Sequence, residues 1–197
     1  LYGDFYEAGL FQQITPQNWL NRSKILKEKA LSIREKLENA KGLEGEDLEA
    51  LKDINQSSKD LNHWVYQQSQ SILQANQIPA VVGGDHSAPF GLIKALKEKH
   101  ADMSVLHVDA HMDLRKAYQG YQFSHASIMY NVMKEVKPTS LVQLGIRDFC
   151  PEEKQYGHEH PNIHTFFDSE TQWKLAQGQA WRDICDQAIS QLSQEVY

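Results

Sequence analysis

The sequence predicts an α/β protein in which helices cover both faces of a mainly parallel sheet. Short apolar runs rich in Val, Ile and Leu alternate with amphipathic helical segments from residue 78 onward. Strands in such an order pair in parallel through right-handed crossovers, which place the helices on the sheet faces. Metal-competent polar side chains follow two of these runs directly, as ligand-binding residues do at the carboxyl ends of parallel strands.

The first 75 residues are predicted to be mostly helical. Residues 1–20 are aromatic-rich and interrupted by Gly and Pro, and we expect loops and short turns there. Apolar residues recur at helical spacing over residues 21–37 and again over residues 48–54. Ser57 or Ser58 is suited to cap a further helix.

Strands and helices alternate in the rest of the chain. Buried strands are predicted at 78–84, 103–110 and 140–146, with a further strand beginning at 195–197; helices are predicted at 90–100, 127–134 and 180–194. We therefore expect one domain over residues 1–197, with a helical part at 1–75 and a metal-binding α/β part at 76–197. No internal repeat or low-complexity tract divides it.

Composition excludes several classes of partner. The 197 residues carry a formal net charge of −6, and no basic stripe is present that would suit nucleic acid or an anionic membrane. No stretch approaches the roughly 20 apolar residues of a membrane span. Two cysteines, Cys150 and Cys185, make no disulfide framework. We expect free thiols and a reducing compartment, the cytoplasm.

The stretch "LHVDAHMDLR", residues 106–115, carries the chemistry. Asp109, His111 and Asp113 occupy every second position after an apolar run, and in extended chain such positions share one face. His86 follows the preceding apolar run, "AVVGG". Carboxylates and imidazoles crowded together without a counter-charge are unfavourable, and a divalent cation removes that cost. Oxygen and nitrogen donors without thiolate favour Mn²⁺, with Zn²⁺, Co²⁺ or Fe²⁺ as alternatives.

The motifs "GGDHS" (83–87) and "DAHMD" (109–113), in this order, resemble the ureohydrolases, the arginase and agmatinase superfamily, and the likeness is to agmatinases of the compact type. The resemblance implies a three-layer α/β/α fold and a binuclear manganese centre. It also implies hydrolysis of a small guanidinium compound to urea and an amine, and assembly into homotrimers or hexamers.

Site residues can be carried over by position. By resemblance, His86 and Asp113 bind the first manganese ion, His111 binds the second, and Asp109 bridges both and so takes part in catalysis. His125, in "YQFSHAS", matches the family's histidine that shuttles protons beside the metals. The family's later S-x-D-x-D motif and its guanidinium-binding glutamate have no counterpart before Tyr197. We therefore expect this chain to lack the C-terminal part of the site.

The substrate is open between several compounds. "DAHMDLR" followed by "SHAS" is closer to agmatinases than to arginases, and agmatine and arginine are the first candidates. Formimidoylglutamases also carry "DLR", which keeps formimidoylglutamate as an alternative. Arg115 is suited to bind a substrate carboxylate with two hydrogen bonds, and equally to form a surface salt bridge.

Two other classes of function compete with this interpretation. A zinc deacetylase of related fold uses D-x-H with one Zn²⁺, but it requires neither His86 nor Asp113. A degenerate member that acts as a binding subunit would have no chemical reason to keep all four upstream ligands. His107 is interpreted as a core histidine or one that supports the metal ligands rather than as a ligand. "HEHPNIH" (158–164) is interpreted as a loop.

Overall fold

The computed structural model describes residues 14–197 and divides the chain into two compact units, Leu1–Leu51 and Lys52–Tyr197. The loops expected at residues 1–20 lie outside the described residues as far as residue 13. Residues 14–16 are not helical, and the first described helix, α2 (Gln17–Glu38), begins after Pro16. Proline at this position has no N–H that would be left without a partner inside the helix.

The first unit contains α2 and the beginning of α3 (Glu46–Gln74). Lys, Glu, Arg and Leu dominate α2, and these straight-chain residues lose little side-chain freedom in a helix. The helix ends at Asn39, whose N–H donates to the carbonyl oxygen of Glu35. An ion pair joins the ammonium of Lys36 to the carboxylate of Asp47, across the connection between the two helices.

Helix α3 is one continuous helix of 29 residues. The expectation that a new helix begins at Ser57 or Ser58 is therefore wrong. The hydroxyl of Ser58 donates to the carbonyl oxygen of Ile54, one turn earlier in the same helix, and so does not cap a helix end. A serine hydroxyl can hydrogen-bond to nearby backbone groups both at a helix N-terminus and inside a helix, so the residue type alone does not show where a helix begins.

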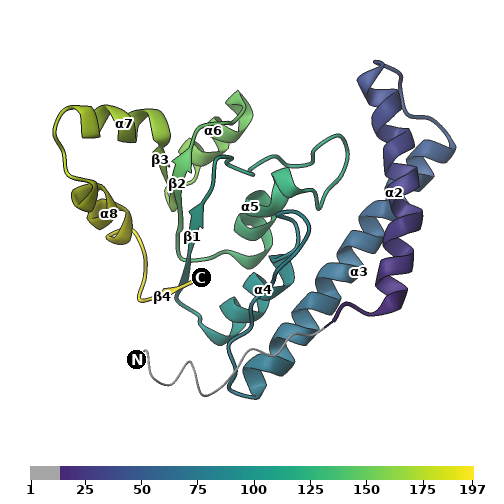
Figure 1. The fold of residues 1–197 in the computed structure, drawn as a ribbon, viewed down its shortest axis with the longest axis horizontal. Coiled ribbons are helices and arrows are strands. Elements are labelled where there is room, and N and C mark those ends of the chain that lie inside the picture. Colours follow the sequence, from purple (N-terminus) through teal and green to yellow (C-terminus); the bar gives the residue numbers. More distant parts are fainter. Residues whose placement is uncertain (1–13) are drawn as a thin grey trace. The chain divides into compact units, whose positions relative to one another are not determined.

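The second unit is built on a four-stranded parallel sheet in the order β3-β2-β1-β4 (Figure 1). The strands are β1 (Met103–Val108), β2 (Leu141–Ile146), β3 (Ile163–Phe167) and β4 (Glu195–Val196). The strands predicted at 103–110, 140–146 and 195–197 are thus confirmed. Residues of β2 are buried or half-buried throughout, as helices on both faces of a parallel sheet require, whereas Leu106 and Val108 of β1 are exposed.

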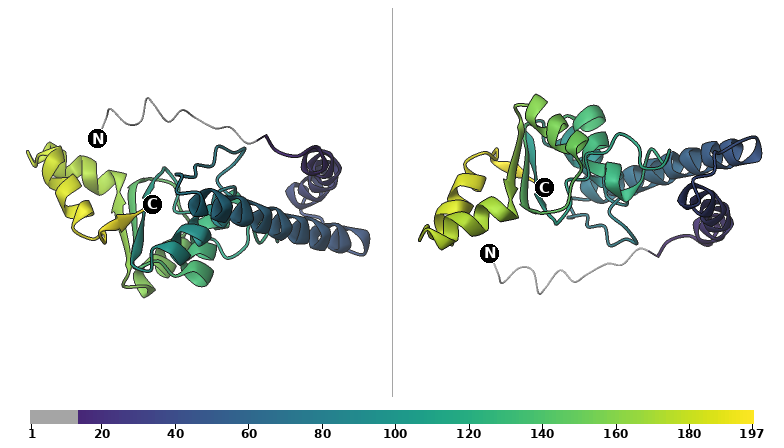
Figure 2. Two further views of the ribbon diagram at one scale, coloured as in Figure 1. Left: turned by 90° about the horizontal axis from the view of Figure 1, so that it is seen from below. Right: turned by 90° about the horizontal axis from the view of Figure 1, so that it is seen from above.

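Helices form a layer on each side of this sheet. Figure 1 shows α7 and α8 on one face and α4, α5 and α6 on the other, and both views in Figure 2 agree. These helices are α4 (Phe90–Lys99), α5 (Ile128–Asn131) with a short 3-10 turn before it (His125–Ser127) and a π turn after it (Val132–Val136), α6 (Pro151–Glu159), α7 (Asp168–Ala176) and α8 (Trp181–Ile189). The predicted three-layer α/β/α fold is confirmed.

The hydrophobic core lies between the sheet and the layer that holds α4 and α5. Its buried members come from both strands and helices: Phe90, Ile93, Met103, Val105, Met112, Leu114, Ile128, Met129, Val132, Met133, Val136, Leu141, Ile146 and Ile163. Met112 and Leu114 belong to the loop that follows β1 and flank Asp113. The segment that carries the candidate ligands is therefore fixed by apolar burial on both sides of Asp113.

Two further sequence expectations differ from the structure. Residues 78–84 form no strand, and Val82 is 99% exposed, because none of the four described strands lies beside this segment to accept its backbone hydrogen bonds. Residues 158–164 are not a loop throughout: α6 extends to Glu159, and β3 begins at Ile163. Among the helices of residues 14–197, none combines the length and apolar character needed to cross a bilayer.

Candidate metal centre

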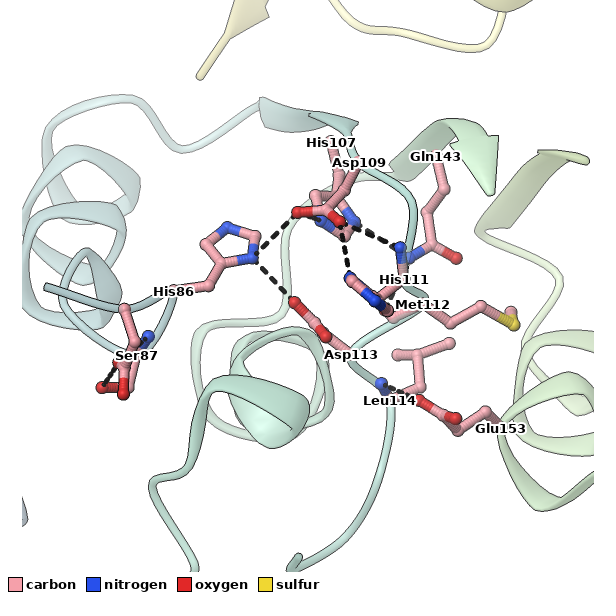
Figure 3. A network of polar contacts seen from close by, with 11 residues as sticks. His86, Ser87, His107, Asp109, His111, Met112, Asp113, Leu114, Gln143 and Glu153 are labelled. Atoms are coloured by element: carbon pink, nitrogen blue, oxygen red, sulfur yellow. Dashed lines mark hydrogen bonds and ion pairs between the residues drawn. The ribbon is translucent and has the colours of Figure 1, made fainter. Parts of the chain in front are cut away.

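Four side chains converge beyond the carboxyl end of β1 (Figure 3). His86, His107, Asp109 and Asp113 each offer one nitrogen or oxygen atom, and these atoms lie within 4.8 Å of one another. His107 comes from β1 itself, Asp109 and Asp113 from the loop after it, and His86 from the loop before α4. The position agrees with the rule that open parallel sheets bind ligands beyond the carboxyl ends of their strands.

The alternation expected from extended chain does not continue past Val108. Strand β1 ends there, and the N–H groups of Arg147 and Asp148 both donate to the carbonyl oxygen of Ala110, which turns the chain toward the end of β2. A turn, not a pleated strand, therefore brings Asp113 back to Asp109. His111 lies at the exposed edge of the cluster: its side chain is 58% exposed, with Nδ1 3.2 Å from Oδ1 of Asp109 and Nε2 3.7 Å from Oδ2 of Asp148.

His86 connects the two carboxylates. Its Nδ1 lies 2.7 Å from Oδ2 of Asp113 and 3.4 Å from Oδ2 of Asp109. The hydrogen bond to Asp113 raises the pKa of His86, and it outweighs burial, which acts in the opposite direction. Nδ1 of His86 thus faces one oxygen of each carboxylate.

Asp109 is held by His111 on one oxygen. The backbone N–H of His111 donates to Oδ1 at 2.9 Å, and Nδ1 of His111 lies 3.2 Å from the same oxygen. Burial acts to raise the pKa of Asp109, but the His111 N–H and the imidazoles of His107 and His86 together outweigh it and lower the pKa. The carboxylate is therefore kept ionised, as a metal ligand requires.

Asp113 is buried and has a left-handed backbone, with a φ of 54°. Aspartate is among the few residues other than glycine that adopt this conformation readily. Its carbonyl oxygen accepts hydrogen bonds from the N–H groups of Met129 and Tyr130 at the beginning of α5. The backbone turn and the helix thus fix the direction of the Asp113 side chain toward His86.

His107, which the sequence suggested was not a ligand, lies within this cluster. Its ring is 4% exposed, its Nε2 has no hydrogen-bond partner among the described residues, and this atom is 3.5 Å from Oδ2 of Asp109. Burial lowers the pKa of His107 to about 4, so its ring is neutral at physiological pH. The only sequence signal that places His107 in the cluster is its spacing: it lies two residues before Asp109, so the two side chains face the same side of an extended strand.

The structure places His125 and Arg115 outside the four-residue cluster. His125 is exposed at the start of the 3-10 turn, with its ring 6.0 Å from that of Tyr118. Nε of Arg115 lies 3.4 Å from Oε2 of Glu153, and the guanidinium lies over the Tyr118 ring. The backbone N–H of Arg115 donates to the carbonyl oxygen of Ala126, so the segment with His125 is joined to the loop after Asp113.

The cluster fits a divalent cation by its chemistry. It offers two carboxylates, one of which is buried, and two imidazoles. Donors of this kind, without sulfur, suit Mn²⁺, Fe²⁺, Co²⁺ or Zn²⁺. Two ionised acidic groups this close together, one of them buried, are costly unless a positive charge lies between them.

The chain belongs to the arginase family, whose family model matches residues 12–197. N(1)-aminopropylagmatine ureohydrolase of Thermus thermophilus is 47% identical over 75 residues, which are 38% of this chain and 25% of that protein. Agmatinase of Bacillus cereus is 33% identical over 88 residues, 45% of this chain and 30% of that protein. The chain thus matches less than a third of the length of these curated relatives.

A solved structure supports the same family. The arginase from Medicago truncatula superposes with a TM-score of 0.55 and 26% identity, covering 60% of this chain and 39% of the arginase. This likeness confirms the predicted arginase-like fold. It also confirms the sequence-based assignment to the ureohydrolase superfamily, which rested on "GGDHS" and "DAHMD".

Proposed function

We propose that the protein containing this chain hydrolyses the guanidino group of a small amine, releasing urea. The observation that carries the proposal is the convergence of His86, Asp109 and Asp113, in which one imidazole nitrogen faces oxygens of two carboxylates. Membership of the arginase family supports the reaction type. This chain matches only part of the length of its relatives, so the proposal concerns the whole protein that contains the chain.

We propose that His86 and Asp113 bind one divalent cation, that His111 binds a second, and that Asp109 bridges the two. Manganese is the proposed ion, since the donors are carboxylate and imidazole only. When bound, such a pair of ions polarises the substrate and lowers the pKa of water to near neutrality. The His111 imidazole lies beside Oδ1 of Asp109, whereas His86 faces Oδ2. The two histidines are therefore on different oxygens of the proposed bridging carboxylate.

His125 is proposed to transfer protons. Departure of the amine requires a proton at the leaving nitrogen, and an imidazole is the side chain that most often acts as a general acid or base. The 3-10 turn that begins with His125 is joined to the loop after Asp113 through the Arg115–Ala126 backbone hydrogen bond. His125 is thus placed on a segment fixed to the metal-binding loop, without itself contacting the cluster.

The substrate proposed is agmatine or a related guanidino amine, rather than arginine. Arginine differs from agmatine by an α-carboxylate, which needs a cationic partner. Arg115 was the candidate partner, but its Nε faces Glu153 at 3.4 Å, and this carboxylate already balances its charge. Two relatives have names that refer to agmatine or an agmatine derivative. Formimidoylglutamate, which carries carboxylates, remains the alternative if Arg115 turns to the substrate.

The experiment uses the full-length protein loaded with Mn²⁺ and offered agmatine, arginine, guanidinobutyrate and formimidoylglutamate in parallel. Urea is measured for the first three and formamide for the last. Urea from agmatine at the highest kcat/KM supports the proposal. Formamide release would favour the alternative. Metal content decides between classes, because a deacetylase of related fold would hold one Zn²⁺, and a binding subunit would turn over none of the four substrates.

Free Cys150 and Cys185 are consistent with a reducing compartment, and we propose the cytoplasm as the site of action. We also propose a homo-oligomer, trimer or hexamer, by analogy with the family alone. Size-exclusion chromatography with light scattering on the full-length protein tests the second proposal directly.

A further inference from the structure

Three polar side chains form a row across the middle of the sheet, one from each of three neighbouring strands. His107 of β1, Gln143 of β2 and Thr165 of β3 are register partners in the parallel ladders. Gln143 is fully buried and His107 is 4% exposed. A buried polar row in an apolar sheet is costly unless its hydrogen bonds are made, so its arrangement calls for a physical explanation.

The amide of Gln143 has only one possible orientation. Its Nε2 lies 2.8 Å from the carbonyl oxygen of Met112, which can only accept a hydrogen bond. Its Oε1 accepts from the hydroxyl of Thr165 at 3.0 Å. A flipped amide would place oxygen against the Met112 carbonyl, so the orientation follows from the partners.

This orientation determines where His107 carries its proton. The second hydrogen of Gln143 Nε2 points to Nδ1 of His107, 3.0 Å away. Nδ1 must accept this hydrogen bond and therefore has no hydrogen of its own, which leaves the ring proton on Nε2. Nε2 is the atom that lies 3.5 Å from Oδ2 of Asp109.

We propose that His107 is a positioning residue that presents an Nε2–H to the carboxylate of Asp109, and that it is not a metal ligand, although it lies within the metal-binding cluster. The inference rests on the proposed metal-dependent function of the same site. A neutral imidazole with its proton on Nε2 has no lone pair at that atom to offer a cation. Gln143 sets this tautomer from the neighbouring strand.

Donor groups lie beside both oxygens of the Asp109 carboxylate. Oδ1 accepts the backbone N–H of His111, and Oδ2 faces the Nε2–H of His107. A carboxylate held in this way loses little further freedom when it binds a cation, so part of the entropic cost of binding is already met by the fold. Hydrogen-bonded residues behind metal ligands typically contribute 10–100-fold to metal affinity.

Three variants of the full-length protein test the proposal, with Mn²⁺ binding measured by isothermal titration calorimetry. His107→Ala removes the donor and is expected to weaken Mn²⁺ binding by about 10–100-fold. His107→Gln places an amide N–H where Nε2 stood and cannot replace an imidazole ligand, so binding within about threefold of wild type is expected. Thr165→Val is the control, because Met112 still orients Gln143, and it should leave Mn²⁺ affinity unchanged.

Equal loss of affinity in His107→Gln and His107→Ala would mean that His107 is a ligand and would overturn the proposal, as would wild-type affinity in His107→Ala. Neutron diffraction from deuterium-exchanged, metal-free wild-type crystals gives a test that needs no variant. Deuterium on Nε2 and none on Nδ1 is expected, and the reverse occupancy contradicts the tautomer. Neither readout depends on urea release, so failure of the proposed hydrolysis would be seen separately.

Discussion

Nδ1 of His86 lies 2.7 Å from Oδ2 of Asp113, although 27 residues separate the two in sequence. This contact ties the segment before α4, which pairs with no described strand, to the loop that follows β1. A cation bound between His86, Asp109 and Asp113 would hold these three side chains together by a stronger attraction. Folding and metal binding are therefore expected to be coupled at this site.

Loading with Mn²⁺ should stabilise the protein. At a free Mn²⁺ concentration 100 times the Kd, the expected gain in unfolding free energy is about 2.7 kcal/mol, and chelation by EDTA should reverse it. Asp113→Asn should largely abolish this gain, because asparagine keeps the left-handed backbone but lacks the charge. Differential scanning calorimetry with and without Mn²⁺ measures the effect. An undiminished Tm shift in Asp113→Asn would exclude Asp113 as a ligand.

Asp109 and His125 should separate metal binding from turnover. Asp109→Asn is expected to lose both Mn²⁺ and urea release, since Asp109 lies at the centre of the cluster. His125→Asn should keep wild-type Mn²⁺ content and lose about 10²–10⁴-fold in kcat, the usual contribution of a general acid or base. Metal analysis and steady-state kinetics on the full-length protein provide the two readouts. Full metal content in Asp109→Asn would show that the bridging role is wrong.

Three of the four strands of the second unit, β1, β2 and β4, were predictable because their signals are local, whereas β3 was not predicted. Short apolar runs such as "VLHV" favour strands of a parallel sheet, and α4 and α8 have clear helical periodicity. The run at 78–84 has the same local character, yet it forms no strand. A strand depends on a neighbour, and the sequence of the segment does not contain that information.

The sequence predicted which residues form the candidate site better than it predicted how those residues are arranged in space. Asp109 and Asp113 do converge, but through a turn and a left-handed residue, whereas His111 lies exposed at the edge between Asp109 and Asp148. The position of His107 depends on Gln143, which is 36 residues away and identifiable only from strand register. Asn55 likewise binds the loop before His125, accepting from the N–H of Gln122 at 2.8 Å. No spacing rule links residues so far apart.

Glu153 should be important for stability. This carboxylate is 4% exposed; Oε1 accepts from the N–H of Leu114 at 3.0 Å, and Oε2 accepts from the N–H of Cys150 at 2.9 Å. It thereby joins the residue after Asp113 to the beginning of α6. Glu153→Ala leaves these donors without a partner and should lower the unfolding free energy by about 2–3 kcal/mol, measured by urea denaturation.

Glu159→Ala is the matched control for this prediction. Glu159 lies at the other end of the same helix, is exposed, and accepts only a surface hydrogen bond from Gln155. Its removal should change stability by no more than about 0.5 kcal/mol. If the two alanine variants unfold at the same urea concentration, the buried hydrogen bonds of Glu153 contribute nothing measurable to the fold.

The contact between α3 and α4 should depend on the absence of a side chain at Gly91. A Cβ at this position would lie 2.3 Å from the carbonyl oxygen of Asn62 and 2.6 Å from the backbone nitrogen of Tyr66. Both are backbone atoms of α3, which cannot move away by a change of rotamer, so the helices would have to separate. Gly91→Ala is expected to cost about 1–3 kcal/mol, more than the roughly 1 kcal/mol that alanine gains over glycine within a helix.

Gly42→Ala supplies the comparison, because a Cβ there meets nothing within 4 Å and its φ lies outside the positive region. That variant should unfold within about 0.5 kcal/mol of wild type in the same urea titration. Gly91→Ala should also keep its Mn²⁺ content once folded, since Gly91 lies on a helix and contacts no candidate ligand. If Gly91→Ala were as stable as Gly42→Ala, α3 and α4 would have to pack less closely than the backbone distances require.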